Sequence, residues 1–91
     1  MASREDLSKL CAKGTVVRHF KGNYYTIIGV GVHTETEETF VIYQSLNNPT
    51  IYIIPYDMFI SKVDKSKYPN ADQEYRFEVA RGKGAECNWL V

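Results

Sequence analysis

The chain has 91 residues, enough for one domain with a modest core but too few for a second domain or a deep catalytic cleft. Eleven basic side chains balance eleven acidic ones, so the overall basic excess that is typical of general nucleic-acid binders is missing. The charges are unevenly spread, because residues 34–57 carry acids and no bases. The simplest interpretation is two solvated surfaces of opposite sign, and a charged docking surface is the alternative.

Targeting signals are not evident in the sequence. Residues 1–13 are polar and of mixed charge, unlike a signal peptide. No apolar run approaches the ~20 residues that a membrane-spanning helix needs. We therefore predict a cytoplasmic protein that has no membrane partner and keeps its two cysteines, Cys11 and Cys87, reduced.

Residues 1–14 are predicted to form an N-terminal helix. Ser3 is a suitable N-cap, and acidic residues follow in the first turn. Leu7 and Leu10 share one face by their spacing, and Gly14 provides a stop. With a single apolar stripe, this helix is expected to lie across the β-domain and cover an edge or an open barrel end.

Residues 15–63 are predicted to form the core of the β-domain. Gly29 and Gly31 fall on one face of its second strand, which indicates a bulge, a sharp bend or the close approach of another segment. A single helical or 3-10 turn is expected at residues 55–59, because proline is acceptable at the start of such a turn. β-branched and aromatic residues dominate four predicted strands, at residues 15–20, 24–33, 40–45 and 50–54.

Residues 64–80 are predicted to form a polar loop followed by a final strand at residues 74–80. Tyr75 and Phe77 alternate with charged residues, so one face of this strand is expected to be buried. In the tail at residues 81–91, glycines favour flexibility whereas Trp89 favours docking, and the sequence leaves both open.

The predicted fold class is mainly β, in a single domain over residues 1–91. Short strands, tight turns, one helical turn and one helix together favour a small SH3-like β-barrel or roll with an N-terminal helix and one short 3-10-like turn.

Four motifs follow one another along the chain: RHFKGNxY at residues 18–25, HTET at 33–36, VIYQ at 41–44 and PxxMF at 55–59. In this order they resemble a small bacterial family known as domain of unknown function 1653, over roughly residues 14–63. The resemblance implies an SH3-like β-barrel and no particular reaction. Where family members commonly have an aromatic residue followed by Val-Arg-Pro, this chain has Ile54 in place of the Arg, so an anionic ligand bound through that Arg side chain in relatives is not expected here.

Metal and nucleophile chemistry is not indicated. Cys11, His19, His33 and Cys87 are too widely spaced for a structural zinc site. Nothing in the sequence lowers a thiol pKa, and no phosphate-binding loop or nucleophile motif is present. We expect no metal, no cofactor and no catalytic residue.

His19 and His33 end two strands that are joined by a tight turn, so we expect them at opposite ends of one hairpin. Each is expected to tie down a turn, His33 within residues 34–36. A functional role is the alternative, because imidazoles titrate near neutral pH and are common in sites.

Aromatic side chains provide the strongest candidate site, on a surface between the turns at residues 21–23 and 55–59. SH3-like barrels bind extended peptides through such surfaces, and bases can stack on them as well. The ordinary alternative is that most of these rings fill the core. The predicted ligand-binding residues are Arg18, His19, Phe20, Lys21, His33, Tyr43, Gln44, Tyr52, Asp57 and Phe59.

The preferred function is a non-catalytic binding module, with a peptide or protein partner favoured over nucleic acid. One alternative is a small enzyme or enzyme subunit in which His19, His33, Gln44 and Asp57 converge in a pocket. Another is a structural unit that forms homo-oligomers through a strand edge or through residues 89–91.

Overall fold

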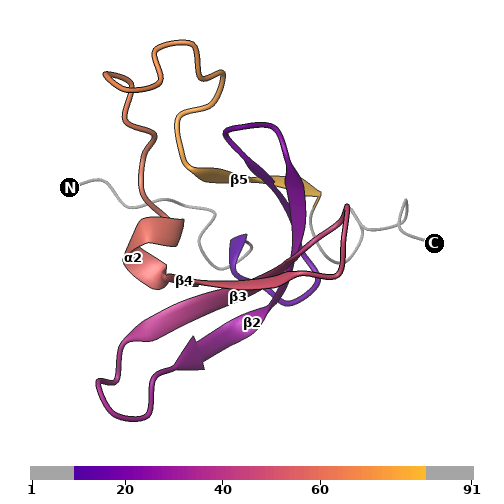
Figure 1. The fold of residues 1–91 in the computed structure, drawn as a ribbon, viewed down its shortest axis with the longest axis vertical. Coiled ribbons are helices and arrows are strands. Elements are labelled where there is room, and N and C mark those ends of the chain that lie inside the picture. The colour runs from indigo at the N-terminus through magenta and orange to yellow at the C-terminus, as the bar shows by residue number, and fades with distance from the viewer. Residues whose placement is uncertain (1–9, 82–91) are drawn as a thin grey trace.

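The computed structural model describes residues 10–81 and contains a five-stranded antiparallel sheet with the strand order β4-β3-β2-β1-β5 (Figure 1). The first four strands form a meander. The chain then makes one helical turn and a long loop before β5 returns to pair with β1. The elements are β1 (Val16–His19), β2 (Tyr24–Val32), β3 (Thr39–Ser45), β4 (Ile51–Pro55), α2 (Tyr56–Phe59) and β5 (Phe77–Arg81).

The first four strands confirm the prediction to within one or two residues at each end. The helical turn predicted at residues 55–59 is α2, a single α-helical turn whose N-cap is Pro55. The last strand, however, begins at Phe77 and not at residue 74. The carboxylate of Glu78 accepts the backbone N–H groups of Glu74 and Tyr75, at 3.1 Å each, so these groups are not part of a regular ladder.

A closed barrel is not formed, which corrects the prediction of barrel closure. Among residues 10–81, no hydrogen-bonded ladder joins β4 to β5, and these strands are the two edges of the sheet. After α2 the chain runs into a projecting loop instead of extending alongside β4 (Figure 1). Side chains connect the two ends of the sheet: Phe59 and Phe77 stack with ring centroids 4.6 Å apart.

The predicted N-terminal helix lies almost wholly outside the described residues, and so does nearly all of the predicted tail. Of the helix, Leu10 is helical and completely buried, and residues 11–13 form a turn and a bend. Gly14 has a φ of 91° and donates its N–H to the carbonyl of Ile27 at 2.9 Å.

The second strand contains the irregularity that its glycines predict. The register with β3 shifts between Ile27 and Gly29, which marks a β-bulge. At Gly31 a Cβ would lie 3.3 Å from Cδ1 of Ile42, so this position requires close approach of the neighbouring strand. The bulge and the close approach were both among the expected explanations.

The core lies on one face of the sheet. Alternation along the strands directs one set of side chains to this face, where α2 and Leu10 cover part of it. On the opposite face Ile51 and Ile53 remain 57% and 65% exposed. The buried core residues are Leu10, Val17, Ile27, Val41, Phe59 and Phe77.

Gly22→Ala is expected to destabilise the protein by about 1–2 kcal/mol, because Gly22 has a φ of 108° at the β1–β2 turn. Gly29→Ala is the matched control. Its φ is not in the left-handed region and an added Cβ meets nothing within 4 Å, so stability should be unchanged or rise by up to about 1 kcal/mol. Urea denaturation measures both, and equal losses would contradict this conformation of the turn.

Candidate functional site

A continuous row of aromatic rings crosses the sheet from one edge to the loop before β5. Adjacent ring centroids lie between 4.5 and 6.5 Å apart, and the contacts are stacked, tilted or edge-on. We call this set the ring row. In order, its members are Tyr52, Tyr43, Tyr25, His19, Phe20 and Tyr68.

Strand register brings the first three rings together. Tyr43 lies directly opposite Tyr52 on β4 and opposite Ile27 on β2, so Tyr25 is its diagonal neighbour on the same face. This is the core-facing side of the sheet, and Tyr25 and Tyr43 pack partly against the core. Tyr52 is 38% exposed, so the row passes from half-buried to accessible at the β4 edge.

His19 links the strand rings to the rings beyond β1. Its Nδ1 accepts the backbone N–H of Lys21 at 3.1 Å, which leaves the ring proton of the neutral imidazole on Nε2. Burial, and then the charges of Arg76 and Lys21, lower the pKa of His19 to about 4. At neutral pH, His19 is therefore an uncharged hydrogen-bond donor.

The Tyr68 end of the row borders a hollow of about 330 Å³, which we call the cationic hollow. Phe20 and Tyr68 meet edge-on across its rim, with centroids 4.9 Å apart. A second hollow of about 340 Å³ shares Phe20, Lys21, Lys67 and Tyr68 with it. The charged residues that line the cationic hollow are Lys21, Lys62, Asp64, Lys67 and Arg76.

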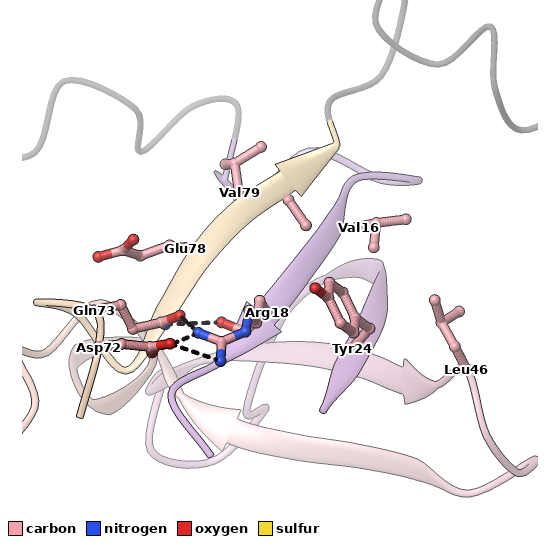
Figure 2. A pocket seen from close by; sticks show the side chains of 9 residues that line it. Val16, Arg18, Tyr24, Leu46, Asp72, Gln73, Glu78 and Val79 are labelled. Atoms are coloured by element: carbon pink, nitrogen blue, oxygen red, sulfur yellow. Dashed lines mark hydrogen bonds and ion pairs between the residues drawn. The ribbon is translucent and has the colours of Figure 1, made fainter. Parts of the chain in front are cut away.

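Arg18 lies in a cavity whose lining includes no member of the ring row; Figure 2 shows the side chains around it. It lines a broad cavity of about 690 Å³, together with Tyr24 and Leu46. Its Nη1 donates to Asp72 at 2.9 Å and to the side-chain oxygen of Gln73 at 2.6 Å. The hydrogen bond with Asp72 raises the pKa of Arg18 and lowers that of Asp72. These contacts fasten the loop to β1, which gives Arg18 a structural role.

Gln73 is the buried part of this fastening, with 8% of its surface exposed. Its side-chain nitrogen donates to the carbonyl oxygens of Arg18 at 3.0 Å, Tyr75 at 2.8 Å and Arg76 at 3.4 Å. One amide side chain therefore positions both the end of the loop and the start of β5.

The remaining predicted site residues are not part of the accessible row. Phe59 meets the ring of Tyr43 at 6.3 Å but is completely buried in the core. Gln44 donates to the carbonyl of Pro49 at 3.0 Å, and its neighbour Tyr43 takes the core-facing side. Asp57 is exposed on α2 and lines a separate small hollow beside Glu38.

His33 ties down the β2–β3 turn, as predicted. Its Nδ1 accepts the backbone N–H groups of Glu35 at 3.1 Å and Thr36 at 3.2 Å. It follows the far end of β2 from the β1–β2 turn, so His19 and His33 lie at opposite ends of the hairpin. Because Gln44 lies apart from both, the geometry does not support the pocket proposed for an enzyme.

The residues predicted from the sequence to bind a ligand did not include Tyr25, Lys67, Tyr68 or Arg76. Tyr25 could have been found, because it alternates with Ile27 and so shares its face. Tyr68 and Lys67 gave no signal, since a polar loop does not indicate which distant turn it will contact.

Among residues 10–81, no group of three or more His, Cys, Asp or Glu side chains is close enough to hold a metal ion. In the same part of the chain, no helix is long and apolar enough to cross a membrane.

The fold and the ring row define a small antiparallel β-domain with an aromatic surface on the core-facing side of its sheet. The chain belongs to a family described as proteins of unknown function (DUF1653), whose model matches residues 15–79. The resemblance seen in the sequence is thus confirmed, and the match spans every member of the ring row. Neither a curated protein nor a solved structure matches this chain.

His19→Gln is expected to flatten the acid dependence of stability. The pKa of His19 is about 4 in the folded protein and 6.5 in the unfolded chain. Between these pH values the chain therefore takes up a proton when it unfolds. Stability contributed by the neutral imidazole is therefore present above pH 6.5 and lost as the pH falls toward 4. Urea unfolding of both proteins across this window measures the difference. Carboxylates titrate in both proteins and so do not affect the comparison. If the two plots of unfolding free energy against pH were parallel, the lowered pKa of His19 would be contradicted.

Gln73→Ala is expected to destabilise the protein by about 1–3 kcal/mol, because it removes the donor from partly buried carbonyl groups. Gln44→Ala is the matched control, since its hydrogen bond to Pro49 is exposed, and it should change stability by less than about 0.5 kcal/mol. Urea denaturation compares the two, and similar losses would show that the Gln73 contacts contribute no more than a surface hydrogen bond.

Proposed function

We propose that this protein is a non-catalytic binding module, built on an SH3-like roll, that holds an extended ligand along the ring row. The observation that carries the proposal is the continuity of the row, in which each ring contacts the next from β4 to the loop before β5. Four meandering strands, a helical turn and a return of β5 to β1 support the SH3-like architecture.

The physical basis is that the middle of the row is supported by the core and its two ends are accessible. Tyr25 and Tyr43 are backed by the core, whereas Tyr52 and Tyr68 are each 38% exposed. Tyrosine rings offer a flat apolar surface and a hydroxyl group that remains wet, a combination that suits a reversible interface. A surface of this kind binds with little loss of side-chain freedom.

We further propose that residues 1–91 form one domain and that this domain acts in the cytoplasm. A peptide or protein segment is the partner that the SH3-like architecture favours. Formation of homo-oligomers stays a prediction, and the exposed side chains of Ile51 and Ile53 on the edge strand β4 are compatible with it.

Tyr52→Ala is expected to weaken ligand binding about 5- to 150-fold, because a stacked aromatic ring contributes about 1–3 kcal/mol. Immobilised protein is exposed separately to a display library of random peptides and to a pool of random single-stranded oligonucleotides. The ligands recovered are then titrated against each variant.

Tyr24→Ala is the matched control for this experiment. Tyr24 is 44% exposed and adjacent to Tyr25, but it lines the Arg18 cavity of Figure 2 and not the ring row. The control should bind as the unmodified protein does. Equal effects of the two substitutions, or no recovered ligand at all from either library, would overturn the proposed function.

A further inference from the structure

We infer that the ligand is a single-stranded nucleic acid, whose phosphates occupy the cationic hollow while its bases stack on the ring row. This inference rests on the proposed binding function and names the ligand class of the same surface. A nucleic acid is preferred here to the peptide that the sequence favoured, because the fold creates a positively charged hollow. Three separate segments form this hollow, and the sequence alone does not bring them together.

The hollow carries a net positive charge. Four cationic side chains and one carboxylate line it. The carboxylate of Asp64 already accepts the backbone N–H of Ser66 at 3.0 Å and its hydroxyl at 2.5 Å. Lys62 pairs with Glu74 at 3.3 Å. Within residues 10–81, Lys21, Lys67 and Arg76 make no ion pair, so three cations remain for an anionic ligand.

Arg76 is held in place by three hydrogen bonds to two other residues. Its backbone N–H donates to the carbonyl of Ser61 at 2.9 Å, and its carbonyl accepts the N–H of Phe20 at 2.9 Å. Its Nε donates to the hydroxyl of Ser61 at 3.2 Å. In the described part of the chain, its terminal amino groups make no hydrogen bond, so a half-buried guanidinium is fixed with two donor groups unused. A planar guanidinium held in this way suits phosphate oxygens.

His19 supplies a further donor without adding charge. It lines the same hollow, and its Nε2–H has no acceptor among residues 10–81. Because its pKa is lowered to about 4, this donor stays neutral and keeps its direction across the physiological pH range.

Cations and rings alternate where the two hollows meet. The Nζ of Lys21 lies 5.9 Å from the ring centroid of Phe20 and 5.5 Å from that of Tyr68, both within cation–π range. Single-stranded nucleic acid has the matching alternation of charged phosphates and flat bases. Proteins that bind it combine stacking rings with a positive groove in this way. A duplex would hide the base faces that the ring row requires.

The test is fluorescence anisotropy with a labelled oligouridylate of about 12 nucleotides, its DNA counterpart, and an RNA duplex of the same length. Binding is measured between about 50 and 200 mM salt. Three phosphate contacts predict a slope of log affinity against log salt of about −2. Lys67→Gln should weaken binding and make the slope shallower by about 0.7. Lys13→Gln removes the same charge from an exposed residue that lines neither hollow, and it should leave the slope unchanged.

Single-strand binding with these slopes supports the inference, and comparison of the RNA and DNA oligonucleotides shows which backbone is preferred. Equal binding of the duplex, or equal effects of Lys67→Gln and Lys13→Gln, would overturn it. If Tyr52→Ala abolishes binding of a recovered peptide while neither oligonucleotide binds, the inference fails and the proposed function stands. If no ligand of either class depends on Tyr52, both fail.

Discussion

The rest of the structure depends on the contacts that the buried ring of Phe77 makes with neighbouring rings. It stacks on Phe59 with centroids 4.6 Å apart and so joins β5 to the helical turn that follows β4. It also meets the rings of His19, Tyr25 and Tyr43 at centroid distances of 5.0, 6.1 and 5.2 Å. One core residue thus holds together the two ends of an open sheet and supports three members of the ring row from behind.

This shared support explains why core and site cannot be separated in so short a chain. A protein of this size has little buried volume to spare, so the outer layer of its core must also supply its binding surface. The chemical consequence is visible at His19, where the packing that fixes the ring also removes enough water to lower its pKa. The physical consequence is preorganisation, since rings that are wedged between neighbours lose little freedom when a ligand arrives.

The sequence predicted the features that depend on residues close together along the chain. Alternating apolar residues located the strands, paired glycines indicated the bulge at Gly29, and the turn chemistry around His33 gave its hydrogen bonds. The sequence did not predict contacts between distant segments. Glu78 accepts the N–H groups that would have extended β5, and the loop carrying Tyr68 packs on Phe20, from which it is separated by 47 residues. Four of the six members of the ring row were therefore predicted as site residues and Tyr25 was predictable by alternation, whereas Tyr68 and the assembly of the cationic hollow beside it were not.

Net charge does not give the sign of a local surface, because a sum over the chain contains no geometry. The acids of residues 34–38 sit at the turn beyond β2, at the opposite end of the hairpin from the β1–β2 turn that bears Lys21. Screening at physiological salt limits the reach of an exposed charge to about 8 Å. A ligand at the Tyr68 end of the ring row is thus governed by Lys21, Lys67 and Arg76, and a chain with no net charge can present a locally cationic site. For a small domain, the sign of a binding surface follows from which loops the fold brings together, and here the loop before β5 decides it.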